Sequence, residues 1–459
     1  MRLNEVDLNG DNGLTFRFRS IDTMLKHDEL KNLEMYFCPF EMEDDAFEGA
    51  LNLYWKGDEI LWDNFIGHYF VVFYVHYVDL ILSEKEERRV PDKINWWLFR
   101  SDMDMESLIS DLLKKPVVKM VKDFAMAKEH KVDGDELRLY LNFLHPSVLE
   151  VIWQFIGDQR SKIKYEQNII DYEKELAQFN WEKAKEQGIF RILNQIHEKK
   201  KRESDLNKLS DWQRWLLKDF PDDYFNALGE MVFPKWYIVS FCRNCTNTRN
   251  WAQYGDSNRG VCLIYRTHQR PSGRGLRLKT CQGYSTSKGK IIVNHIEKLH
   301  NVKYSSERPA LNFFEMLGCI PRKMKDEWFH DRKGNVSSYY VKDDNDPKKE
   351  NWRRQYCKMF NELVSQKGED WDGLEEERMV LENSILVDYE NEPSERKIRY
   401  DFEELKGIIW GCNVKDDKKK EVRDIIDELC EKNGRTDFEF YQAVKDPSSH
   451  KIWIEKEVL

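Results

Sequence analysis

Strand-like segments lie at both ends of this chain, and a long stretch with helical periodicity separates them. Leu14–Ser20 alternates apolar and polar residues after an Asn-Gly turn signal, which is typical of a strand. From Trp236 onward, short segments rich in Val, Ile, Tyr and Trp are separated by Gly, Ser and Asn turns. Residues 96–219 instead favour helices. The sequence therefore predicts an α/β (α+β) fold: a split mixed β-sheet domain built from both chain ends, with a long helical insertion.

The predicted domain boundaries follow this pattern. Residues 1–82 form the N-terminal part of the sheet domain, residues 83–230 the helical insertion, and residues 231–459 the C-terminal part. Within the insertion, Val148–Asn194 indicates an amphipathic helix pair, and the basic run His197–Asp205 is interpreted as a solvated face, with nucleic-acid contact as the alternative.

Composition limits the class of protein. Aromatic residues make up 13% of the chain and charged residues 34%, so we expect a packed core. The formal net charge of −10 disfavours bulk attraction to nucleic acid or to an anionic membrane, although a local basic patch can still bind phosphate. Phe65–Val78 is too short to span a membrane and predicts a buried core helix, with His68 and His76 as core residues.

The cysteines indicate a reducing compartment. The chain has nine of them, and Met1–Asn12 lacks the apolar stretch of a signal peptide. We therefore expect a cytoplasmic protein with free thiols. Cys242 and Cys245 have zinc-site spacing, but no second pair completes four ligands, so two buried thiols are expected and no metal.

Six blocks, in one order along the chain, carry a family resemblance. They are Phe16–Ser20, Asp44–Glu48, Val239–Tyr265, Val302–Pro309, Glu376–Arg378 and Leu405–Cys412. With these blocks the chain resembles the bacterial domain-of-unknown-function family 2971, over roughly the first 80 and the last 225 residues. The chain departs from the family pattern at Ala46, Cys242 and Leu374, where the family usually has Pro, Ser and Glu.

Three polar residues suggest a chemistry. Arg19, Ser240 and Glu376 follow an Arg–Ser–Glu order that is similar to ADP-ribosyltransferases. This weaker analogy implies that they are catalytic residues of an enzyme that cleaves the nicotinamide–ribose bond of NAD. A carboxylate stabilises the oxocarbenium-like transition state of such a cleavage, and an Arg holds pyrophosphate or ribose by forked hydrogen bonds.

The analogy and the family blocks together imply a set of residues that bind NAD. They are Arg19, Ser20, Trp251, Tyr254 and Arg378. Trp251 and Tyr254, three apart on a predicted helix, are expected to stack on the nicotinamide ring.

Two details of the motif stay open. Ser285–Ser287 also resembles the Ser-Thr-Ser strand of arginine-directed transferases, although Ser240 lies in the stronger block. On a strand, Glu375 and Glu377 share one face and Glu376 the other. Glu376 is preferred because Arg378 then takes the family's Arg position. A solvated turn is the plain alternative for the acidic run, and a loop is the plain alternative for the serines.

Two other functions fit the sequence. The first is a metal-dependent nuclease or phosphoesterase, in which Mg²⁺ would be bound by Glu376 together with Glu43, Asp44, Asp45 and Glu48. A basic run would then contact the phosphate of the substrate. That run contains Arg266, Arg270, Arg274, Arg277 and Lys279, and its plain interpretation is a solvated hairpin loop.

The third function is a non-enzymatic module that senses a ligand or binds a protein partner through the insertion. The resemblance also implies a bacterial toxin or phage-defence effector, with a nucleotide substrate, an acceptor that is protein, nucleic acid or water, and no membrane.

Overall fold

The computed structural model describes most of the chain. The described residues are 8, 13–45, 47–84, 87–97, 105–127, 130–156, 188–203, 209–271, 273–317, 320, 322–340, 347–383 and 386–457. Most of the predicted helix pair over Val148–Asn194 lies outside them, as do the last two residues of the basic run His197–Asp205.

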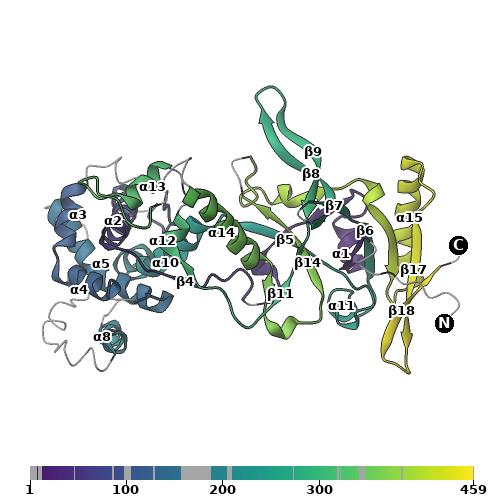
Figure 1. The fold of residues 1–459 in the computed structure, drawn as a ribbon, viewed down its shortest axis with the longest axis horizontal. Coiled ribbons are helices and arrows are strands. Elements are labelled where there is room, and N and C mark those ends of the chain that lie inside the picture. Colours follow the sequence, from purple (N-terminus) through teal and green to yellow (C-terminus); the bar gives the residue numbers. More distant parts are fainter. Residues whose placement is uncertain are drawn as a thin grey trace. The chain divides into compact units, whose positions relative to one another are not determined.

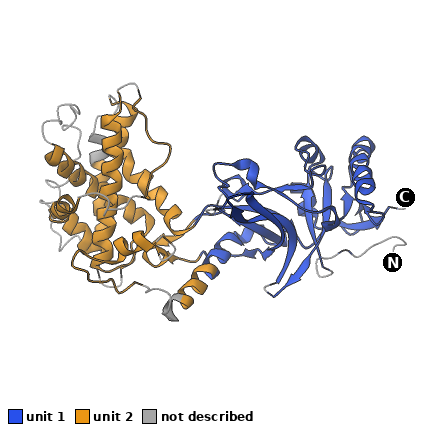
Figure 2. Ribbon diagram, turned by 90° about the horizontal axis from the view of Figure 1, so that it is seen from above, with its two compact units in different colours: residues 1–50, 234–308, 358–459 blue, residues 51–233, 309–357 orange. Residues whose placement is uncertain are grey.

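The described chain divides into two compact units (Figure 2). The sheet unit contains residues 1–50, 234–308 and 358–459, and the helical unit contains residues 51–233 and 309–357. These bounds differ from the predicted boundaries, because Glu59–Leu82 (α2) belongs to the helical unit. A helix that is apolar on all sides needs other helices around it, which the edge of a sheet does not provide.

A large mixed sheet forms the centre of the sheet unit (Figure 1), so the predicted α/β class is confirmed. In spatial order its strands are β10 (His300–Asn301), β14 (Glu376–Glu382), β5 (Trp236–Cys242), β1 (Leu14–Arg19), β6 (Val261–Arg266), β16 (Leu405–Trp410), β17 (Glu439–Asp446) and β18 (Lys451–Lys456), with β3 (Cys38–Pro39) beside β5. β16 and β17 run parallel, and the other neighbours are antiparallel. The first strand of the chain therefore lies inside the sheet, between two later strands.

A second sheet lies in the same unit. Its strands are β2 (Glu34–Tyr36), β15 (Lys397–Arg399), β8 (Gly273–Ser285), β7 (His268–Arg270) and β9 (Gly289–Lys298). Figure 1 shows β8 and β9 as a long hairpin that projects from the unit. The basic run interpreted as a hairpin loop lies largely on β7 and β8 themselves. A short parallel pair joins β11 (Lys303–Tyr304) to β13 (Gln366–Lys367).

Both faces of the central sheet are covered. Along β6, Leu263 and Tyr265 pack into one core cluster, and Cys262 and Ile264 pack into the other. This explains the continuous apolar runs of the central strands, because alternation with polar residues marks a sheet with one solvated face. The covering helices are α1 (Ile21–Lys26), α11 (Thr248–Gln253) and α15 (Asp416–Asn433). The sequence of Lys418–Asn433 predicts a helix that ends at Gly434, and α15 confirms both, because Gly434 follows it in a left-handed conformation (φ 62°).

The helical unit is built around α2. Its other helices are α3 (Glu106–Leu113), α4 (Pro116–Ala125), α5 (Gly134–Ile156), α8 (Ile189–Glu203), α9 (Asp211–Arg214), α10 (Phe220–Val232), α12 (Phe313–Met316) and α13 (Arg322–Phe329). The short strands β4 (Leu53–Tyr54) and β12 (Leu311–Asn312) pair in this unit, and α14 (Pro347–Val364) begins in it.

α2 is the core helix that the sequence predicts. It is long and apolar enough to cross a membrane, but 67% of its most apolar window is buried inside the protein. His68 lies 2.8 Å from the Tyr224 hydroxyl, and His76 accepts a hydrogen bond from the Asn95 amide. Both histidines are therefore satisfied inside the helical core.

The close approach of β1 and the turn before β6 gives a stability test. A Cβ on Gly260 would lie 2.2 Å from the backbone oxygen of Arg19, and neither backbone can move without breaking the β1–β6 pairing. We predict that Gly260→Ala lowers the free energy of unfolding by about 1–3 kcal/mol in urea denaturation followed by circular dichroism. Gly283→Ala on β8, where the nearest atom to the new methyl is 3.7 Å away, is the control and should change little. Equal losses in both variants would contradict the steric explanation.

Candidate functional site

A cavity opens where two central strands separate. β1 and β5 are in register at Phe16 and Cys242, and beyond this pair residues of both strands line a cavity of about 150 Å³. Arg19, Ser240 and Glu376 all line it. The three residues that the sequence nominated as catalytic, which lie far apart along the chain, therefore share one cavity.

The cavity is small. Engineered protein cavities of similar volume hold a benzene molecule, whereas pockets for drug-sized ligands are several times larger. It therefore has room for one ring of a nucleotide, and the remainder of such a ligand has to lie outside it.

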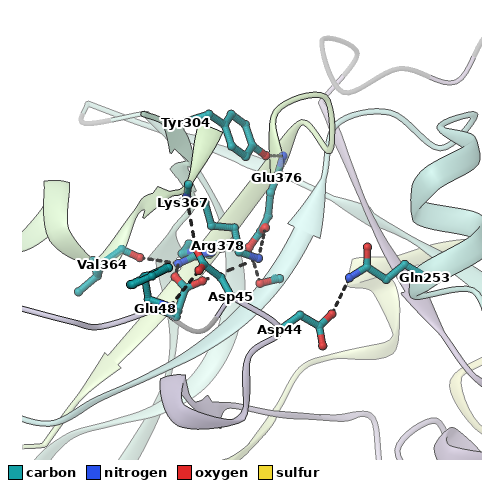
Figure 3. A network of polar contacts seen from close by, with 12 residues as sticks. Asp44, Asp45, Glu48, Gln253, Tyr304, Val364, Lys367, Glu376 and Arg378 are labelled. Atoms are coloured by element: carbon teal, nitrogen blue, oxygen red, sulfur yellow. Dashed lines mark hydrogen bonds and ion pairs between the residues drawn. The ribbon is translucent and has the colours of Figure 1, made fainter. Parts of the chain in front are cut away.

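Three side chains hold the carboxylate of Glu376 in place in the cavity lining (Figure 3). Ser240 Oγ and Arg378 Nη2 each donate to its Oε1 at 2.7 Å, and Lys367 Nζ donates to its Oε2 at 2.8 Å. The Glu376 amide donates to the Tyr304 hydroxyl at 2.9 Å, which fixes the backbone as well. Glu376 therefore has a defined orientation before any ligand arrives.

Glu48 completes a neutral buried network with these groups. Arg378 pairs with Glu48 and also donates to the Val364 carbonyl at 2.9 Å, and Lys367 Nζ lies 3.9 Å from Glu48 Oε2. Burial alone would raise the pKa of Glu376, but Arg378, Lys367 and Ser240 together lower it to about 2. Glu376 is therefore ionised at neutral pH.

Two arginines of β1 add positive charge to the cavity lining. Arg17 and Arg19 alternate with apolar residues on β1, so both point to one face, where they meet Glu29. Arg19 Nε donates to Glu29 at 3.0 Å, whereas the buried Arg17 Nη1 has no hydrogen-bond partner among the described residues. Burial and the neighbouring Arg17 lower the pKa of Arg19. Two guanidinium groups against one carboxylate leave a positive charge that an anion would neutralise.

Glu43 is a second carboxyl group in the cavity lining. Burial and the carboxylates of Glu376 and Glu48 raise its pKa to about 7, although Lys367 and Arg378 oppose this. A group that titrates near neutrality can take up or release a proton during a reaction.

Tyr254 also lines the cavity, as the sequence predicts for a residue that contacts a ring. Burial and the charge of Glu376 raise the pKa of its phenol, which keeps the ring neutral. The structure corrects the prediction for Trp251, because this side chain is fully buried. It packs edge-on to Phe18 and donates to the Cys245 carbonyl at 2.7 Å, so it belongs to the core and cannot stack on a ligand.

Two other predicted nucleotide-binding residues have different places. Ser20 precedes α1 and is not among the residues that line the cavity. Arg378 is fully buried beside Glu376, so it positions the carboxylate and does not reach a ligand. Arg378 stands where the family resemblance predicts an arginine, but the role of this arginine here is structural.

The structure also decides the open details of the motif. Ser285–Ser287 forms the turn of the β8–β9 hairpin, with the two hydroxyls 3.1 Å apart, so Ser240 is the serine beside the carboxylate. Glu375 lies before β14 with a left-handed backbone (φ 52°) and accepts a hydrogen bond from Asn244. Glu377 lies on the opposite face of β14 from Glu376.

The acidic loop does not present ligands to a metal ion. Asp44 accepts from Gln253 at 2.6 Å (Figure 3), Asp45 accepts from the Gly368 amide at 3.2 Å, and Glu48 pairs with Arg378. In the part of the chain that the structure describes, no group of three or more His, Cys, Asp or Glu side chains is arranged for metal binding. Asp44, Asp45 and Glu48 therefore bind protein groups in this structure.

The CxxC pair consists of two buried thiols. Cys242 Sγ donates to the Asn244 carbonyl and Cys245 Sγ to the Leu8 carbonyl, both at 3.4 Å. Burial raises the pKa of Cys242 well above its usual value, so the thiol form is retained.

Sequence reasoning missed three residues of the site. Lys367 lies outside every family block, and no local pattern marks it. The role of Glu43 as a group that titrates near neutrality depends on tertiary burial. Arg17 could have been found, because it shares a strand face with Arg19 in the FRFRS block.

Comparison with models of protein families, with curated proteins and with solved structures finds no match to this chain. The resemblance to family 2971 therefore stays a prediction, and the site is defined by its own geometry.

The buried network gives a second stability test. Lys367→Met leaves Glu48 and Glu376 with a single buried cation, so we predict a loss of about 3–5 kcal/mol in unfolding free energy at pH 7. Lys418→Met removes exposed ion pairs with Asp22 and Glu421 and is the control, for which we expect little change in stability. Urea denaturation of both variants measures the difference, and losses of similar size would show that the network is not the cause.

Proposed function

We propose that the sheet unit binds NAD at the cavity between β1 and β5 and cleaves its nicotinamide–ribose bond, as an ADP-ribosyltransferase or an NAD glycohydrolase does. The observation that supports this is the charge in the cavity lining. Arg17 and Arg19 share one carboxylate and leave a positive charge, and the ionised carboxylate of Glu376 lines the same cavity.

NAD has the matching distribution of charge. Its pyrophosphate is anionic, and its nicotinamide ring carries a positive charge until the glycosidic bond breaks. The arginines suit the pyrophosphate because a guanidinium forms forked hydrogen bonds with phosphate oxygens. The volume of the cavity suits the nicotinamide ring, which Tyr254 would contact, while the adenosine half lies outside.

Glu376 would act on the charge that develops as the bond breaks. The electron pair of the C1′–N bond moves to the nicotinamide nitrogen, which becomes neutral, and positive charge spreads over C1′ and the ribose ring oxygen. A carboxylate that is already ionised and oriented by Ser240, Lys367 and Arg378 stabilises this charge without reorganising.

Glu43 would serve the second half of the reaction. An acceptor hydroxyl, amine or water has to lose a proton as it bonds to C1′, and Glu43 lines the same cavity with a pKa near neutrality. The acceptor is a protein, a nucleic acid or water. We further propose that the protein acts in the bacterial cytoplasm as a toxin or phage-defence effector.

The assay for this proposal follows nicotinamide release from NAD by chromatography. We predict that Glu376→Gln lowers the rate by about 10²–10³-fold, because the shape is kept and the charge is lost. Arg19→Ala should weaken NAD binding and so raise KM. Glu375→Gln, an exposed neighbour outside the cavity, is the matched control and should retain the wild-type rate.

Ser240→Ala removes one hydrogen bond to Glu376 and keeps both of its cationic partners. A lower rate in this variant without a lower melting temperature would therefore reflect a loss of catalysis and not a folding defect. The melting temperature of each variant is measured alongside its rate. No nicotinamide release by the wild-type protein, or equal rates in the wild type and Glu376→Gln, would refute the proposed function.

The pH dependence tests Glu43. With Glu43 as the base, the rate should rise as the pH passes through about 7 and level off above it, because only the ionised carboxylate accepts a proton. Glu43→Gln should lower the plateau and remove this inflection. A wild-type profile that is flat between pH 5 and 9 would assign the proton transfer to another group.

A further inference from the structure

A second and larger cavity lies on the other side of β14. Its volume is about 570 Å³, and Glu377 lines it, whereas Glu376 lines the first cavity. Consecutive residues of a strand point to opposite faces, so one strand contributes a carboxylate to each cavity. All residues that line the second cavity belong to the sheet unit.

The lining of the second cavity is cationic. Arg243, Arg274 and Lys298 line it, and Glu377 is its one acidic lining residue. Arg274 is fixed by Glu377 through two bonds, Nε to Oε1 at 3.1 Å and Nη2 to Oε2 at 2.7 Å, and its Nη1 donates to the Leu14 carbonyl at 3.1 Å. Arg274 and Glu377 therefore neutralise each other, and these hydrogen bonds fix both side chains in the cavity lining.

Two cations remain in the cavity without a neutralising partner. Neither Arg243 nor Lys298 forms an ion pair within the described part of the chain, although the chain as a whole is acidic, with a formal net charge of −10. Arg243 is exposed and Lys298 is half-buried, so both side chains reach solvent. Two uncompensated positive charges at one cavity on an acidic protein define a site for an anion.

The remaining lining supplies neutral hydrogen-bonding groups. Burial, Lys298 and Arg378 lower the pKa of His300 to about 4, so the imidazole is uncharged at neutral pH. Asn301, Gln269 and Ser365 contribute amide and hydroxyl groups. No tyrosine, tryptophan or phenylalanine is among the described lining residues, so the cavity has no surface on which a base would stack.

We propose that this second cavity binds a small molecule through two or more linked phosphate groups. The volume suits a ligand of nucleotide size. Arg243 and Lys298 would contact the phosphates, and the neutral groups would complete their hydrogen bonds. A nucleic-acid strand fits less well, because its backbone requires a row of cations along a groove, and here the cations converge on one cavity. The proposal does not depend on NAD cleavage, because Glu376 and Glu377 face different cavities.

Isothermal titration calorimetry of the full chain with inorganic pyrophosphate tests the proposal. We expect a pyrophosphate site that either Arg243→Gln or Lys298→Gln weakens about tenfold, because each substitution removes one charged hydrogen bond. Both side chains reach solvent and form no ion pair among the described residues, so the substitutions should leave the fold intact. Lys432→Gln, an exposed residue of α15 outside the cavity, makes the same change in net charge and should not alter binding.

Further titrations distinguish the source of the phosphate. ADP should bind as pyrophosphate does and adenosine should not, which would place recognition in the phosphates. The absence of pyrophosphate binding would overturn the proposal, as would unchanged binding in the Arg243→Gln, Lys298→Gln double variant. Loss of binding in Arg19→Gln with retention in that double variant would assign the anion to the first cavity and also refute it. Binding of a single-stranded oligonucleotide without binding of pyrophosphate would replace it by a nucleic-acid site.

Discussion

The buried network of Glu48, Arg378, Glu376 and Lys367 is the interaction on which the first cavity depends. Removing four charges from water is costly, and the cost is offset only when each charge meets opposite partners at hydrogen-bond distance. Glu48 and Arg378 are 330 positions apart in the chain, so their contact holds the acidic loop against β14. The same contacts keep Glu376 ionised and fix its orientation. Stability and the proposed chemistry therefore depend on the same side chains, and catalysis here would use a group that the fold already needs.

Because consecutive residues of β14 point to opposite faces, this strand contributes one carboxylate to each of two cavities. Glu376 meets two cations and a serine on one face, and Glu377 meets Arg274 and the Thr15 hydroxyl on the other. Each carboxylate has its own cationic partners, which limit the negative charge that this strand adds to either cavity. An anion that enters either cavity is attracted by the remaining cations and is not repelled by the acidic run that the sequence shows.

Local patterns predicted the elements that local physics determines. The apolar run of α2, the glycine stop of α15 and the continuous apolar strands β5 and β6 follow from composition and spacing. The sequence analysis assigned α2 to the sheet domain, although a helix that is apolar on all sides needs other helices around it. For the site, the order of Arg19, Ser240 and Glu376 along the sequence was sufficient to predict that these three distant residues line one cavity. The burial of Trp251 and the role of Lys367 depend on tertiary packing, which no spacing rule describes.

In this fold, cations whose charge is not fully compensated are the candidates for ligand binding, whereas cations in complete ion pairs are structural. Lys367 and Arg378 are buried in ion pairs with Glu376 and Glu48. Arg17 pairs with Glu29 but has a buried nitrogen without a hydrogen-bond acceptor among the described residues, and Arg243 and Lys298 line one cavity without an ion pair among those residues. Such arrangements reduce stability, because like charges repel and a buried donor loses its bond to water. A protein that keeps them at two cavities places its uncompensated positive charge where an anionic ligand would satisfy it.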